Sequence, residues 1–242
     1  MLTRLLVLLV VLVVLAVGAD RLGAVLAARS VAEGLTSSQR LTGPATVSFP
    51  DIPFLTQAVA GRYDRVDVTL QGVPVTNGLV VDRIDTTLHG VTAPAGPMLR
   101  GQLTQLPVER GEAVAFVSFT SLADAARRTI GAGALGVQLT SLDLGRAAAD
   151  RVAVGTAIRT PLGTFALRGQ AQLTVKGGVV GVRLLPESLT GVPAALRSRV
   201  AALLDLTALA PPLPFGFRAT SVAVEGAGLR LRATGTRLSL PA

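Results

Sequence analysis

Apolar and polar residues alternate along many short stretches of this chain, a pattern typical of β-strands that bury one face. In residues 63–70, for example, Val66, Val68 and Leu70 fall on one face, while charged and hydroxyl side chains fall on the other. The same reading predicts further strands near residues 47–49, 84–88, 108–119, 137–144, 151–158, 164–175, 179–185, 221–224 and 229–240. The chain should therefore fold around a large amount of half-buried sheet.

Few helices are available to cover that sheet. Helical spacing predicts amphipathic helices over residues 20–35, 121–131 and 193–206, with Gly34 ending the first and Ser121 capping the second. Such a sheet must close into a barrel, pack on a second sheet, or curl around a helix and leave a groove of lipid size. We predict an α+β fold built on an antiparallel sheet. The sequence pattern alone leaves these three arrangements open, although strong curvature of the sheet is favoured.

Local breaks in the pattern support this curvature. The alternation changes parity at Gly72, near residues 226–228 and at Gly235, which suggests bulges and bends. The pairs at residues 77–78 and 177–178 are turn signals. Pro50 and Pro53 cannot donate ladder hydrogen bonds, so regular pairing should stop there.

The N-terminus carries a targeting signal. Arg4 precedes an uninterrupted apolar run that ends in small residues at 17–19, as in a secretory signal peptide. Because apolar residues continue past residue 20, an uncleaved signal anchor fits nearly as well. We expect residues 1–19 to be a signal peptide or anchor, and residues 20–242 to form a single domain outside the cytoplasmic membrane, secreted or anchored on the periplasmic side of the cell envelope.

Composition limits the possible partners. The net charge of +8 suits either nucleic acid or an anionic lipid surface. Half of the residues are hydrophobic but only 3% are aromatic, so the core must be aliphatic. The chain has no cysteine, which excludes disulfides and thiolate metal sites. Charge alone leaves both kinds of partner open.

Three stretches resemble the LmeA-type family of actinobacterial envelope phospholipid-binding proteins. They are residues 47–57 with 63–66, residues 84–91, and the C-terminal segments 211–216, 220–224 and 228–229. The resemblance implies a tubular, TULIP-like architecture, that is, an α+β fold in which a long, strongly curved antiparallel sheet wraps around helices and encloses an elongated apolar groove. Residues 20–242 would then form a single lipid-binding domain with a phospholipid and a membrane surface as partners, and with no nucleic acid, metal or other cofactor. The resemblance also implies a role in envelope lipid or lipoglycan maintenance, of the lipomannan type. A phosphatidylinositol-type lipid is one candidate ligand.

An acyl-chain groove needs a continuous aliphatic lining, and an anionic head group needs a nearby guanidinium. The candidate groove residues lie in the proline-flanked segment and on the apolar faces of strands. They are Phe49, Ile52, Phe54, Leu55, Val66, Val68, Leu70, Phe165, Leu167, Leu173, Leu229 and Leu231. Arg62 and Arg65 are the head-group candidates.

Catalysis has little support in the sequence. His89 is the only histidine, no nucleophile elbow is present, and Asp82 and Asp85 should point to opposite faces of a strand. We therefore predict a non-catalytic protein that holds or shuttles an anionic phospholipid. The alternatives are a membrane-anchored scaffold for an envelope glycosyltransferase and, with less support, a lipid hydrolase.

Overall fold

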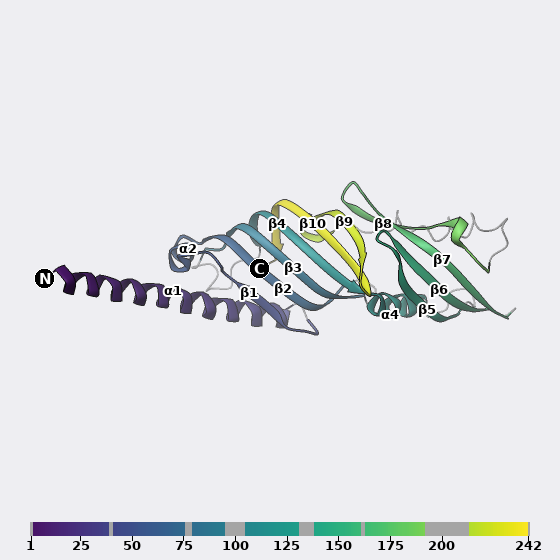
Figure 1. Ribbon diagram of the computed structural model, residues 1–242, viewed down its shortest axis with the longest axis horizontal. Coiled ribbons are helices and arrows are strands. Elements are labelled where there is room, and N and C mark those ends of the chain that lie inside the picture. Colours follow the sequence, from purple (N-terminus) through teal and green to yellow (C-terminus); the bar gives the residue numbers. More distant parts are fainter. Residues whose placement is uncertain are drawn as a thin grey trace.

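The computed structural model describes residues 2–38, 41–75, 79–94, 105–130, 138–160, 163–191 and 213–241, which form an elongated molecule (Figure 1). The helices in these residues are α1 (Leu2–Ser38), α2 (Phe54–Ala60) and α4 (Phe119–Ile130), with short 3-10 turns at Pro186–Ser188 and Pro214–Gly216. The strands are β1 (Ala45–Ser48), β2 (Arg62–Pro74), β3 (Val80–Thr92), β4 (Gln105–Ser118), β5 (Gln138–Ala148), β6 (Arg151–Thr160), β7 (Gly163–Lys176), β8 (Val179–Leu184), β9 (Arg218–Glu225) and β10 (Gly228–Pro241).

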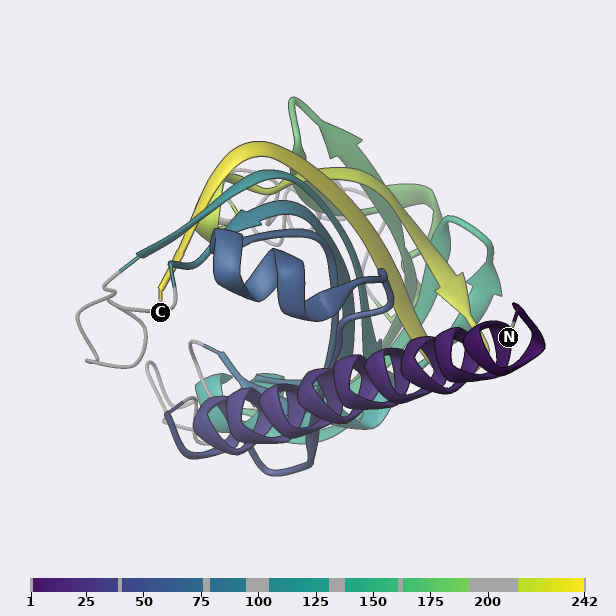
Figure 2. The same cartoon turned by 90° about the vertical axis from the view of Figure 1, so that its left-hand side faces the viewer.

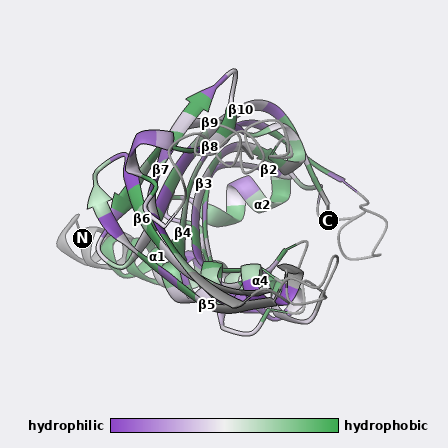
Figure 3. Cartoon of the chain, turned by 90° about the vertical axis from the view of Figure 1, so that its right-hand side faces the viewer, coloured by the Kyte–Doolittle hydropathy of each residue, from purple (hydrophilic) through white to green (hydrophobic). Residues whose placement is uncertain are grey.

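The strands form two antiparallel sheets. One has six strands in the order β1-β2-β3-β4-β10-β9, and the other has four in the order β5-β6-β7-β8. Seen from the end at which α1 projects, the larger sheet arches over α2 while α1 runs along the open side (Figure 2). From the opposite end both sheets follow the same curve, with α4 beside the open side (Figure 3). The predicted α+β fold with a curved antiparallel sheet, and every strand expected from the alternation, are confirmed.

The two sheets meet at the free edge of β9. The backbone N–H of Ala219 donates to the carbonyl of Gly178 (2.9 Å), and the N–H of Val224 donates to that of Ala149 (2.8 Å). The accepting residues lie in the turns of the β7–β8 and β5–β6 hairpins, so the second sheet covers an edge that would otherwise be open to pairing with another chain. The predicted turn at residues 177–178 is confirmed.

The apolar residues form two buried clusters. The first lies between α1, α2 and the concave face of the six-stranded sheet, and includes Ala24, Phe54, Val66 and Leu88. The second lies where the sheets meet and is built on Phe119, Val152, Leu173 and Val224.

The helices differ from the sequence expectation in three ways. The first predicted helix is the second half of a continuous α1, which passes Gly34 and ends at Ser38, so the predicted stop is wrong. Helix α2 was not expected, because its seven residues are too few to show a period. The cap of α4 is Ser118 rather than Ser121, since the Ser118 hydroxyl accepts the Ser121 N–H at 3.1 Å.

The predicted bulge at Gly72 is also wrong. Pairing of β2 with β3 keeps one register on both sides of it, from Gln71 opposite Arg83 to Val73 opposite Val81. Gly72 instead takes a left-handed φ of 62°, and its carbonyl accepts the Thr42 N–H at 3.0 Å. The register shift in this sheet falls between Arg232 and Ala233 of β10, not at Gly235, and residues 226–227 form the β9–β10 turn. The predicted helix at 193–206 and the turn at 77–78 lie outside the described residues.

Candidate functional site

A groove of about 410 Å³ runs between α1 and β1, within the volume range of small-ligand sites. Its walls come from one face of α1 and from the β1 segment. They are Arg21, Ala24, Val25, Ala28, Arg29 and Ala32 of α1, and Ala45, Thr46, Val47, Ser48 and Phe49. The groove therefore combines an aliphatic lining with two arginines.

Small side chains on α1 leave the room for this groove. Ala24, Ala28 and Ala32 are spaced four residues apart, so they lie on one stripe of the helix. A methyl group at each position lets α1 pack beside β1 without filling the space between them. The strand contributes Val47, which is buried, and the half-buried ring of Phe49 follows it.

The two arginines of the groove have different environments. Arg21 donates to the Asp20 carboxylate (2.7 Å) and to the backbone carbonyl of Asp51 (2.9 Å), so its donors are engaged by the protein. Arg29 is exposed, and no ion pair joins it to a described residue. Of the two, Arg29 has its guanidinium available for an anion at the groove rim.

Asp20 fixes α2 against α1. Its side chain is buried, and its Oδ1 accepts the backbone N–H of Leu55 at 2.7 Å. This N–H lies in the first turn of α2, where Pro53 offers no side-chain cap, so Asp20 supplies the missing acceptor from another helix. The Leu55 N–H, and then Arg21, hold the pKa of Asp20 below its ordinary value.

An aromatic cluster lies behind the groove. The ring centroids of Phe49 and Phe54 are 5.1 Å apart, and those of Phe49 and Tyr63 are 5.2 Å apart. The cluster joins the loop after β1, helix α2 and strand β2 into one packed unit. Tyr63 was missing from the predicted site residues, and burial raises its pKa.

The concave face of the larger sheet continues the apolar surface. Register places Leu70, Ile84, Ala115, Leu231 and Val222 opposite one another in turn, in one row across five strands. Cross-strand partners share a face, and all five side chains are half-buried. Two predicted groove residues far apart in the chain, Leu70 and Leu231, thus belong to one strip.

With this geometry in view, comparison with known proteins decides the family. A family model described as LmeA-like phospholipid-binding matches residues 18–234. The chain belongs to this family. No curated protein and no solved structure matches the chain. Membership confirms the predicted family and supports a lipid-binding role, and the matched region begins just before Asp20.

The other predicted groove residues of this LmeA-like chain that the structure describes occupy four environments. Val66 and Val68 pack in or against the first cluster, and Leu173 and Leu229 meet in the second. Leu167 is half-buried on β7, and the side chain of Phe165 lies outside the described part. Ile52 and Leu55 are 62% and 46% exposed, so they face outward rather than into the groove.

The predicted head-group arginines lie away from the groove lining. Arg62 pairs with Glu109 at 2.6 Å, and Arg65 pairs with Asp67 at 3.0 Å. All four side chains are largely exposed or at the surface. Arg29 had not been singled out from the sequence, because nothing in the local pattern shows that β1 lies beside its part of α1.

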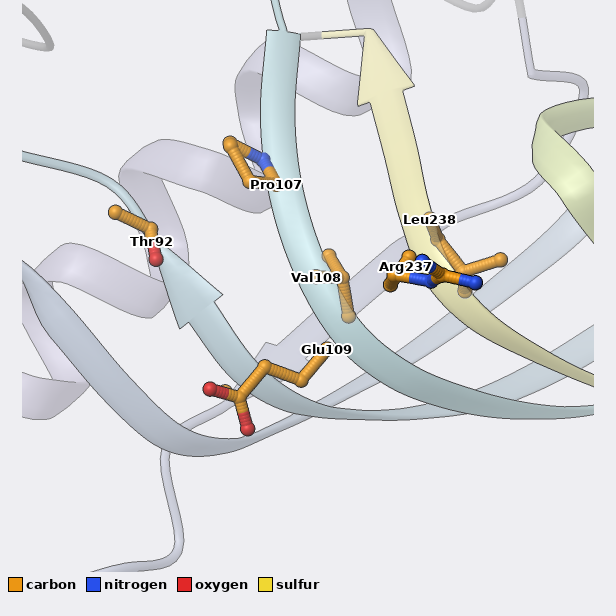
Figure 4. A pocket seen from close by; sticks show the side chains of 7 residues that line it. Thr92, Pro107, Val108, Glu109, Arg237 and Leu238 are labelled. Carbon is orange, nitrogen blue, oxygen red and sulfur yellow. The ribbon is translucent and has the colours of Figure 1, made fainter.

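A second pocket, of about 260 Å³, lies near the ends of β3, β4 and β10, with Thr92 on one side and Arg237 and Leu238 on the other (Figure 4). Its volume falls below the usual range for small-ligand sites. Among the described residues no group of three His, Asp or Glu side chains could hold a metal ion. Asp82 accepts the Ser118 N–H at 2.7 Å, which gives this carboxylate a structural role beside α4.

Proposed function

We propose that this protein is a non-catalytic, extracytoplasmic carrier of an anionic phospholipid. One acyl chain occupies the groove between α1 and β1 and continues onto the concave face of the sheet, while Arg29 binds the phosphate. The observation that carries this proposal is the apolar groove with Arg29 at its rim, an exposed arginine without an ion pair to any described residue, in a chain of a phospholipid-binding family. Each methylene buried there contributes about 0.8 kcal/mol.

The N-terminus supports an envelope location. The side chains of residues 10–17 are exposed and apolar, and α1 contains one segment, Val10–Ser37, that is long and apolar enough to cross a membrane. We propose that residues 1–19 deliver or anchor the protein on the outer side of the cytoplasmic membrane. There it supports maintenance of envelope lipids or lipoglycans by holding or moving a phospholipid, with phosphatidylinositol-type lipid as one candidate.

Photo-crosslinking tests this function on the full chain. The protein is reconstituted in nanodiscs that contain phosphatidylglycerol with a diazirine in one acyl chain, and crosslinked peptides are identified by mass spectrometry. We expect crosslinks to the peptides that carry Ala24–Ala32 and Val47–Phe49. Residues 2–19, which are apolar from Leu5 onward, should react with bulk lipid in any case and serve as an internal control. Crosslinks confined to residues 2–19 would refute the proposal.

A further inference from the structure

An exposed apolar surface lies beside α1, outside the groove and both buried clusters. We define it as the α2 patch, formed by Ile52, Leu55 and Val59, which are 62%, 46% and 89% exposed. Leu55 and Val59 are four residues apart and so share one face of α2. The adjoining face carries Phe54, which is buried, and Ala58, which packs against the first cluster. Helix α2 therefore buries one apolar face and turns the neighbouring apolar face to solvent.

The position of this patch suggests what covers it. Helix α2 lies at the end of the molecule from which the first half of α1 projects (Figures 1 and 2). A Cβ at Gly23 would lie 3.2 Å from Leu55 Cδ2, so the patch meets α1 one turn after the exposed apolar run ends. Residues 2–19 of α1 measure about 27 Å at the helical rise, close to the roughly 30 Å of a bilayer core.

These observations point to a contact between the α2 patch and the membrane. We infer that the α2 patch inserts into the outer surface of the bilayer and holds the domain against it. This inference rests on the proposed function and deepens it. Arg21 and Ala24, at the start of the groove, belong to the same turn of α1 as Gly23, which the α2 patch contacts. An acyl chain could then leave the bilayer and enter the groove without crossing water.

Single-cysteine labelling of the full chain tests whether the α2 patch inserts into the bilayer. The chain has no cysteine, so each of Ile52→Cys, Val59→Cys and Ser221→Cys carries one thiol for an environment-sensitive NBD probe. Ser221 is exposed on β9, away from the α2 patch, and is the matched control. The protein is placed in nanodiscs of equal parts phosphatidylcholine and phosphatidylglycerol, with or without doxyl-labelled lipid.

We expect blue-shifted emission and several-fold stronger doxyl quenching at positions 52 and 59 than at position 221. Quenching at positions 52 and 59 equal to that at position 221 would refute the insertion of the α2 patch into the bilayer. The photo-crosslinking experiment detects lipid in the groove and does not depend on the α2 patch probes. Failure of the carrier function and failure of the membrane contact are therefore distinguishable. Groove crosslinks together with a water-exposed probe at position 59 would support the carrier function and refute the insertion of the α2 patch. A lipid-buried probe at position 59 without groove crosslinks would support the insertion and refute the carrier function.

Discussion

Ala28→Leu tests whether the groove between α1 and β1 holds an acyl chain. Ala28 lines the groove and lies in the middle of its small-residue stripe, between Ala24 and Ala32. Leucine and alanine are both strong helix formers, so the change should leave α1 intact. It should place an isobutyl group in the space that we assign to the lipid.

The size of the effect follows from the volume that is lost. Leucine adds three carbon atoms to the alanine methyl, which displaces about three lipid methylenes, or about 2.4 kcal/mol at 0.8 kcal/mol each. Since 1.4 kcal/mol is a factor of ten in affinity, binding should weaken about 50-fold. A smaller loss would mean that the chain shifts along the groove rather than leaving it.

The assay is a fluorescence titration of the detergent-solubilised full chain with phosphatidylglycerol that carries pyrene in one acyl chain. The matched control is Ala19→Leu, at an exposed position of the same helix outside the groove. Thermal unfolding of both variants shows whether the fold is retained. If Ala28→Leu keeps a native melting temperature and binds as tightly as Ala19→Leu, the groove does not hold the acyl chain.

Three further outcomes follow from the same structure. Phe54→Ala should lower the free energy of unfolding by about 3–5 kcal/mol, whereas Val59→Ala, at an exposed site, should change it by less than about 0.5 kcal/mol in a denaturant titration. Arg29→Ala should weaken phosphatidylglycerol binding about tenfold through loss of a charged hydrogen bond, and Arg146→Ala, on the second sheet, should leave it unchanged. The pKa of Asp20 lies below its ordinary 3.8, so its stabilising contribution is complete above that pH and is lost as the pH falls through the lowered value. Asp20→Asn should therefore melt lower than the native chain near neutral pH, and the difference should shrink on acidification.

The strands could be predicted because their signal is local. A period of two shows which residues share a face, and it placed Val66, Val68 and Leu70 together before any partner was known. Register then brought Leu231 into the row of Leu70. The prediction of a bulge at Gly72 was wrong, because one residue with a left-handed φ can accommodate a change of parity in the sequence without a shift of strand register.

The groove could not be predicted in the same way. Half of the residues in its α1 wall are alanines, which a hydropathy analysis does not distinguish from an ordinary helix. Their spacing at Ala24, Ala28 and Ala32 becomes informative only once β1 is known to lie alongside. Helix α2 escaped notice for a related reason, since the acceptor that completes its first turn is Asp20, 35 positions away from Leu55. Both features depend on contacts between distant segments.

The two possible fates of the N-terminus differ in what they leave to hold the groove at the membrane. Cleavage after Ala19 would make Asp20 the first residue and would still keep the carboxylate that accepts the Leu55 N–H. The domain would then rely on the α2 patch alone to approach lipid, as a mobile carrier requires. Retention of residues 1–19 would instead fix the groove entrance one helical turn above the bilayer, because α1 is continuous from Leu2 to Ser38. Since both forms keep the Asp20 carboxylate that accepts the Leu55 N–H, the orientation of α2 relative to the groove should be the same for a tethered and a released protein.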